Sequence, residues 1–272
     1  MKPRWMLCSV AVGLAAAIAC EDDSKQHAVA ADASRRADAA DSNDAGTSRA
    51  SVLDLADVKL NPMSYDWFDF RPNVKKLILA GAAETEHVAI LWYTTADGGV
   101  GLHHHAKTES VYVIDGTQTD AKGSYPTGTV YFNPPGSGHQ ITESSGFFLL
   151  AYAAPPDFMR TDEIGEYTPV RIDTAAERLT DDYAFEAKSN GVAVYTVPLE
   201  DTGGMHAALL EVTTPNAYAF SGSYVLVLKG HCVLEGARYG EGILVVSKTV
   251  TPRTYDVAAS DDAKCTALAV SF

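Results

Sequence analysis

The chain contains the segment Gly101-Leu-His103-His104-His105-Ala-Lys-Thr-Glu109-Ser-Val-Tyr-Val-Ile-Asp-Gly116. Successive side chains on a strand point to opposite faces, so His103 and His105 share one face while His104 points to the other. Glu109 has the parity of the first pair, and a turn between two paired strands would bring its carboxylate beside them. The segment therefore predicts a chelating group on β-structure, with His104 as a packing or solvent-facing residue.

A second segment supplies one further candidate ligand. It reads Gly128-Thr-Val-Tyr-Phe-Asn-Pro134-Pro-Gly136-Ser-Gly-His139, which is a strand-like run followed by a Pro/Gly turn that would aim His139 inward. Hydrogen bonds satisfy many single histidines in protein cores, but that interpretation leaves Glu109 and His139 as coincidences. We therefore predict that three imidazole nitrogens and one carboxylate oxygen bind one divalent metal ion.

The two segments resemble the two motifs of the cupin superfamily over roughly residues 62–157. The first motif, His-x-His, three residues, Glu, six residues and Gly, is matched by His103, His105, Glu109 and Gly116. The second, Gly, five residues, Pro-x-Gly, two residues and His, is matched by Gly128, Pro134, Gly136 and His139. The resemblance implies a jelly-roll β-barrel that holds the metal inside.

The rest of the chain reads as further strands. Short apolar or alternating runs, each followed by Gly, Pro, Asp or Ser, occupy residues 74–80, 88–95, 110–114, 128–132, 146–153, 192–198, 207–213, 224–228, 242–247 and 265–272. Only residues 173–182 have a helix-like pattern with an acidic start, where an interdomain connection would fall. The fold class predicted is all-β.

An internal repeat divides these strands into two tandem cupin (jelly-roll) barrels. The runs Val-Tyr-Val-Ile-Asp-Gly116 and Val-Leu-Val-Leu-Lys-Gly230 are equivalent, and Gly128 and Gly242 follow at the same offset. The same offset places the non-ligating side chains Ala217, Ala219, Ser223 and Arg253 opposite the four candidate ligands. The second barrel is therefore predicted to have lost its metal. It would act as a packing partner, or bind an anion through Arg253.

The N-terminus predicts export. A short basic segment precedes an apolar run, from Trp5 to Ile18, that is too short to span a bilayer comfortably. It ends in Ala-Ile-Ala-Cys20, which resembles the lipobox of bacterial lipoproteins and implies lipidation of Cys20. Ordinary cleavage and a transmembrane anchor remain alternatives. We expect a periplasmic or cell-surface lipoprotein that contacts the membrane through its lipid anchor only.

The segment after Cys20 has almost no large apolar side chain up to about residue 50, so it cannot offset the entropy of ordering. The predicted order is therefore a signal peptide (1–19), a disordered tether (20–55), a metal-binding cupin domain (56–157), a linker (158–182) and a degenerate cupin domain (183–272).

Two cysteines remain in the exported part of the chain. In the jelly-roll order, the strand after Gly230 lies beside the last strand, so Cys232 and Cys265 are placed to meet. They would form a disulfide or act as two small buried hydrophobic residues. The net charge of −14, without a basic stripe, argues against nucleic acid as a partner.

The ligand set leaves the metal and the activity open. Three imidazoles and one carboxylate suit Fe, Mn, Zn, Ni or Co. One hypothesis is a dioxygenase-like oxidoreductase that acts on a small organic molecule. The alternative is a non-catalytic ligand- or metal-binding module, because residues 74–156 also resemble the zinc cupin domain of cupin-type anti-sigma factors, which are sensors. The resemblance leaves a homodimer open.

One further side chain is a candidate for acid–base work. Glu143 stands where the family often has Asn, and it shares the parity of His139, four residues earlier. A carboxylate there would either act beside the metal or lie exposed at a sheet edge.

Overall fold

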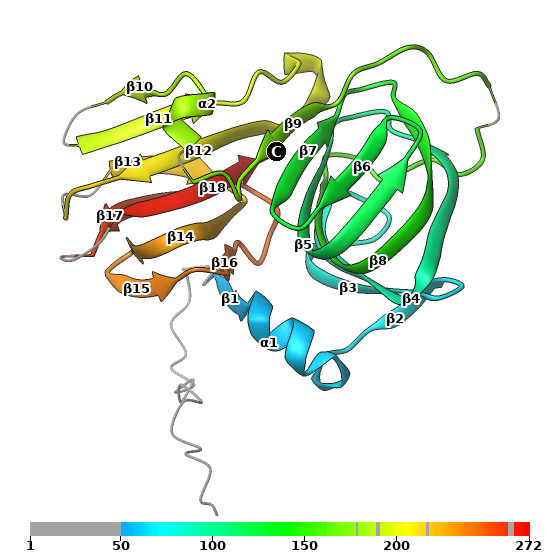
Figure 1. The fold of residues 1–272 in the computed structure, drawn as a ribbon, viewed down its shortest axis with the longest axis horizontal. Helices are drawn as coiled ribbons and strands as arrows, with labels where there is room; N and C mark the ends of the chain where they lie inside the picture. The colour runs from blue at the N-terminus through cyan, green and yellow to red at the C-terminus, as the bar shows by residue number, and fades with distance from the viewer. Residues whose placement is uncertain (1–49, 161, 178, 189–190, 216–217, 261–263) are drawn as a thin grey trace, which may run out of the picture. The chain divides into compact units, whose positions relative to one another are not determined.

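The computed structural model describes residues 50–160, 162–177, 179–188, 191–215, 218–260 and 264–272. The predicted signal peptide, the predicted lipidation site Cys20 and the repeat position Ala217 lie outside these ranges. Two sheets make up most of the described chain, which is all-β as predicted (Figure 1). Within these ranges, no helix has the length and apolar character needed to cross a membrane.

The first barrel is an eight-stranded antiparallel sheet. Its pairing order is β2-β3-β4-β8-β5-β7-β9, and β6 pairs with β5. Its strands are β2 (Phe68–Arg71), β3 (Val74–Gly81), β4 (His87–His104), β5 (Glu109–Asp120), β6 (Gly123–Pro126), β7 (Thr129–Asn133), β8 (Gly138–Tyr152) and β9 (Val170–Asp173).

The second barrel is a ten-stranded sheet with the main order β1-β16-β14-β18-β12-β11-β10, in which β17 pairs with β13 and β14, and β15 with β14. Its strands are β1 (Ser51–Asp54), β10 (Glu186–Ala187), β11 (Val192–Thr196), β12 (His206–Val212), β13 (Tyr218–Gly222), β14 (Tyr224–Leu234), β15 (Ala237–Gly240), β16 (Ile243–Val246), β17 (Arg253–Ala259) and β18 (Cys265–Ser271).

The described helical elements are short. They are α1 (Leu55–Leu60), η1 (Pro62–Ser64), α2 (Leu179–Asp182) and η3 (Asp201–Gly203). The helix predicted over residues 173–182 is therefore wrong for most of its length. Asp173 ends strand β9, residues 174–177 form a turn, and only Leu179–Asp182 is helical. The turn is held by hydrogen bonds, because the Asp173 carboxylate accepts the Ala175 backbone N–H and the Thr174 hydroxyl donates to the Gly128 carbonyl.

The internal repeat is visible in the pairing. In the first barrel β5 pairs with β6, β7 and β8, and in the second β14 pairs with β15, β16 and β18. Gly116 and Gly230 hold the same left-handed conformation, with φ of +85° and +72°. A Cβ at either position would lie 2.0 Å from a carbonyl oxygen of the neighbouring strand, so both positions require glycine. The structure thus contains two tandem jelly-roll barrels.

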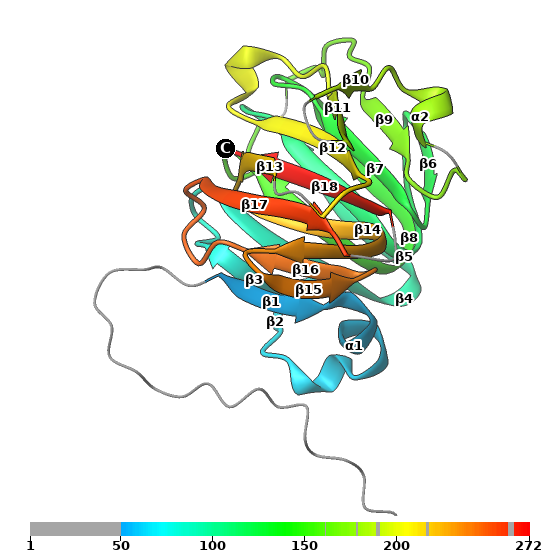
Figure 2. The same ribbon diagram turned by 90° about the vertical axis from the view of Figure 1, so that its left-hand side faces the viewer.

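The predicted disordered tether, which ran to residue 55, is too long, because residues 51–54 form strand β1. It pairs with β16 of the second barrel, in the same way as β9 pairs with β7 of the first (Figure 2). Large apolar side chains explain this order, since Leu53, Leu55 and Val58 all pack into the cluster between the barrels. The second barrel therefore contains a strand that precedes the first barrel in sequence, and the predicted linker contains a strand of the first.

Three apolar clusters account for the packing. One, which includes Val88 and Leu149 of the first barrel and Leu209 and Leu268 of the second, lies between the two sheets. The interior of the second barrel is mostly aliphatic. The interior of the first carries several tyrosines beside its aliphatic residues, and it surrounds the predicted ligands.

Candidate metal centre

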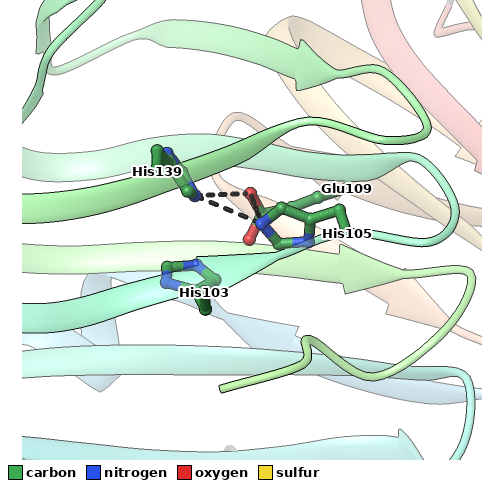
Figure 3. Close-up of side chains that lie close together, drawn as sticks. All are labelled: His103, His105, Glu109 and His139. Carbon is green, nitrogen blue, oxygen red and sulfur yellow. Dashed lines mark hydrogen bonds and ion pairs between the residues drawn. The ribbon is translucent and has the colours of Figure 1, made fainter. Parts of the chain in front are cut away.

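The four predicted ligands converge inside the first barrel (Figure 3). His103 on β4 lies directly opposite His139 on β8, His105 follows the end of β4, and Glu109 begins β5. One ligand atom from each lies within 4.8 Å of all the others, and every side chain is at most 3% exposed. Glu109 Oε2 is 3.3 Å from His105 Nε2 and 3.4 Å from His139 Nε2. These atoms form a site for one divalent metal ion.

Hydrogen bonds fix how two imidazoles face the site. The Nδ1–H of His103 donates to the Gly101 carbonyl at 2.8 Å, and that of His139 donates to Asp120 Oδ2 at 2.9 Å. Each bond fixes the ring so that its Nε2 faces the site, where a metal would bind. The Glu109 carboxylate accepts a bond from Asn133 Nδ2 at 2.8 Å. The ligands are therefore oriented by partners behind them, as metal sites require.

The protonation states of three ligands suit metal binding. Burial lowers the pKa of His103 to about 3 and that of His105 to about 4, so both imidazoles are neutral at pH 7. Burial alone would raise the pKa of the Glu109 carboxyl, but the neighbouring histidines, His105 first, hold it well below its usual range. Three of the four ligands thus already have the protonation state that coordination needs.

The pKa of His139 leads us to expect that metal affinity depends on pH. Burial alone would lower its pKa, but hydrogen bonds to Asp120 and Glu109 raise that pKa to about 9. A metal must displace this proton, so apparent affinity should rise about tenfold per pH unit up to pH 9 and then level off. Titration calorimetry at pH 7 in buffers of different ionisation enthalpy should detect release of one proton per metal, and release of none would contradict this assignment.

Asp120 was not found from the sequence, although it holds His139. Glu109, Val111 and Val113 point inward at odd positions, but a bulge between Val113 and Asp115 shifts the register, and the later inward positions are even. Counting parity from Glu109 would therefore place Asp120 outside. The sequence offers no indication of this bulge that we can identify.

Substituting Asp120 by Asn should weaken metal binding by about 10–100-fold. Asp120 Oδ1 accepts the backbone N–H groups of Lys122 and Gly123, so an Asn would turn its amide nitrogen toward His139 Nδ1. The imidazole would then carry its proton on Nε2, where the metal binds. Competition with a chromophoric chelator would measure the change. Asp115→Asn, an exposed change on the same strand, is the control, and equal affinity in both variants would contradict this role.

The same effect corrects the expectation for Glu143. A bulge between Ile141 and Ser144 of β8 shifts the parity, so Ser144 is buried and Glu143 is exposed. Glu143 is therefore not beside the metal. His104 is 1% exposed and lies away from the ligand group, and neither ring nitrogen has a hydrogen-bond partner among the described residues. It packs rather than coordinates.

The equivalent positions of the second barrel hold no ligands. Ala219 lies on β13, Ser223 follows that strand and is fully buried, and Arg253 on β17 forms an ion pair with Glu235. In the part of the chain that the structure describes, the four residues of the first barrel form the one group suited to a metal. Cys232 and Cys265 form a disulfide between β14 and β18, with their Cα atoms 5.1 Å apart.

A small cavity adjoins the metal site. Its walls include His103, Glu109 and His139 together with Tyr93, Gln118 and Tyr152, and its remaining lining residues are Phe70, Leu91, Val100, Ile141, Leu150 and Phe158. Its free volume is about 10 Å³, which is room for one water molecule. Three of the four ligands therefore border a space of this size.

Three histidines and one glutamate inside a jelly-roll barrel define a metal-binding β-barrel protein. Residues 56–154 match the family of the ChrR cupin-like domain. The first barrel is therefore a cupin domain. No curated protein matches the chain in sequence.

Solved structures share the fold at low sequence identity. A candidate dioxygenase from Nostoc punctiforme is 11% identical, with 84% of this chain and 85% of that chain covered and a TM-score of 0.56. A candidate glyoxylate-induced protein from Pseudomonas aeruginosa is 12% identical, with 85% and 90% covered and a TM-score of 0.50. A deletion variant of oxalate decarboxylase from Bacillus subtilis is 14% identical, with 84% and 78% covered and a TM-score of 0.46.

Proposed function

We propose that the chain is an exported metal-binding cupin whose centre carries out a dioxygenase-like oxidoreduction of a small organic molecule. The cavity carries this proposal, because three of the four ligands line it and the bound ion would face free space there. A closed structural site would have no such space. The description of the Nostoc protein, which shares the fold, points to the same reaction class.

The residues around the cavity have distinct parts in this proposal. A bound Fe, Mn, Zn or Ni would supply a Lewis acid and a coordination position for a substrate. Leu91, Ile141 and Leu150 exclude water. Gln118 is held between two phenols, since it accepts a bond from Tyr131 at 2.6 Å and donates one to Tyr93 at 3.3 Å. This fixed polar group is placed to orient a substrate that enters the cavity.

The size of the cavity limits the substrate. A molecule larger than water needs the wall to move, and the aromatic pair Phe70 and Phe158 is one part of that wall. The Arg71 guanidinium lies 4.4 Å from one ring centre and 4.1 Å from the other, so it holds the pair together through cation–π contacts. We therefore expect a substrate of a few heavy atoms.

The second candidate is a non-catalytic binding or sensor module. The observation that favours it is the chemistry of the lining, where no carboxyl or amine group other than the ligand Glu109 stands among the described residues. A site with one water-sized space and no carboxyl or amine group besides a metal ligand can bind a metal and a small ligand without turning it over.

Export and a lipid anchor at Cys20 complete the proposal. The apolar run before Cys20 supports it, and so does the disulfide between Cys232 and Cys265, since such bonds persist in oxidising compartments.

Metal analysis of protein purified from its own host, paired with oxygen consumption over a panel of small phenols and diketones, separates the two candidates. The oxidoreductase predicts iron or manganese and oxygen uptake with at least one compound. Zinc without turnover would instead support the binding module.

A further inference from the structure

The first barrel buries one lysine that the metal site does not use. Lys76 on β3 is 2% exposed, and its Nζ lies 2.7 Å from His87 Nε2, on a side chain that is fully buried. The His87 Nδ1 lies 2.7 Å from the Thr85 carbonyl, so Nδ1 carries the hydrogen and Nε2 accepts. This pairing makes Lys76 the donor and fits an ammonium group beside a neutral imidazole.

This ammonium lies directly behind the wall of the metal cavity. Its Nζ is 4.9 Å from the ring centres of both Phe70 and Tyr152, and both rings line the cavity. Across three neighbouring strands, His87 lies opposite Tyr152 and Tyr152 lies opposite Glu109. Lys76 itself pairs with Leu91, but its ammonium contacts His87 and so reaches the layer of the carboxylate ligand, where its charge is poorly screened.

The buried charges of the barrel do not balance once a metal is present. Among the described residues, the buried Lys, Arg, Asp and Glu side chains are Lys76, Glu109 and Asp120. One ammonium and two carboxylates leave one negative charge, and a divalent ion with neutral imidazoles turns this into one positive charge. An unbalanced charge in a dry interior is costly, and a monoanion on the open coordination position would remove the imbalance.

We propose that Lys76 is a specificity-determining residue that makes the metal-loaded centre select a small carboxylate anion over a neutral molecule of the same size. This inference rests on the proposed metal site and names the class of its ligand. The lysine does not touch the ligand. It acts through its charge, one aromatic ring away, so the effect should appear in affinity and depend on ligand charge. Burial lowers the pKa of Lys76 only to about 8, which leaves the group mainly protonated at pH 7.

The experiment uses the whole mature protein loaded with Co²⁺, whose visible absorption reports both the metal and its additional ligands. Formate and its neutral counterpart formamide are titrated at pH 7. The wild-type protein should bind formate at least tenfold more tightly than formamide. Lys76→Met should raise the Kd for formate at least tenfold and leave that for formamide unchanged. Lys75→Met is the matched control, because Lys75 is the next residue on β3 and pairs with exposed Asp69.

Equal formate affinity in the wild-type and Lys76→Met proteins would overturn the inference. The wild-type protein alone also tests the inference: if it binds formamide as tightly as formate, the inference is wrong. This second test holds even if the Lys76→Met protein fails to fold. Lys76→Arg, which keeps the charge, should keep the preference for formate. Failure of the metal site itself is a distinguishable outcome, because the cobalt absorption would then be missing before any anion is added.

Discussion

A chain that carries both His103→Ala and His139→Ala is expected to lose its divalent metal, whereas the wild-type protein should hold close to one ion per chain. The two imidazoles face each other across β4 and β8 and supply half of the ligand set. His105 and Glu109 alone would leave a buried ion with two protein ligands, too few to offset its lost hydration. Elemental analysis of the purified variants measures the loss directly.

His104→Ala is the matched control for this result. His104 belongs to the same segment and is equally buried, but it lies outside the ligand group. Alanine is smaller than histidine, so it fits at this buried position without a clash. This variant should keep one ion per chain. Metal retained in the double variant would mean that the ion binds elsewhere.

The second large effect concerns the disulfide of the second barrel. Replacing Cys232 and Cys265 by alanine should lower the free energy of unfolding by about 3–4 kcal/mol, because the bond closes a loop with a sequence separation of 33. For a folded part of this size the melting temperature should fall by about 10 °C. Thermal unfolding followed by circular dichroism in the metal-loaded state measures it.

Metal content is the control for the cysteine variant. The disulfide lies in the second barrel, so the variant should still bind one ion in the first. Labelling of thiols under non-reducing conditions gives an independent check. Two free thiols in the exported wild-type protein, or a melting temperature that does not change, would contradict a stabilising disulfide.

The ligand set was predictable because its members lie in two short segments, and the local sequence of each segment decides where the side chains point. Strand parity places His103 and His105 on one face, and the turn after Pro134 and Gly136 directs His139 inward. The positions of Asp120 and Glu143 were not predictable in this way. Asp120 follows a β-bulge and Glu143 lies within one, and a bulge inserts one residue and exchanges the two faces of the strand. Counting alternate residues in the sequence therefore assigns side chains to the correct face of a strand only as far as the next bulge.

The ten strands expected from apolar runs are all present, although several are longer than predicted. Eight of the described strands were not predicted, and two of them, β1 and β9, were missed for a common reason. Both are edge strands with mostly exposed or half-buried side chains, and their pairing partners are distant in sequence. Residues 51–54 pair with residues 243–246. No pattern within four residues encodes such a partner.

The internal repeat predicts that the second barrel has no metal site, and the structure shows which side chains stand at the equivalent positions. Where the first barrel has Gln118, bonded to Tyr93 and Tyr131, the second has Cys232 in a disulfide within a mostly aliphatic interior. Among the described residues, the ligands and their polar supports are thus concentrated in the first barrel. The second barrel packs a broad apolar face against the first.

Anomalous scattering from crystals of the metal-loaded protein, recorded on both sides of the absorption edge of the bound metal, would locate the ion. We expect one peak per chain, about 2.0–2.2 Å from Nε2 of His103, His105 and His139 and from a Glu109 oxygen. A peak in the second barrel, or no peak among these four side chains, would contradict this expectation.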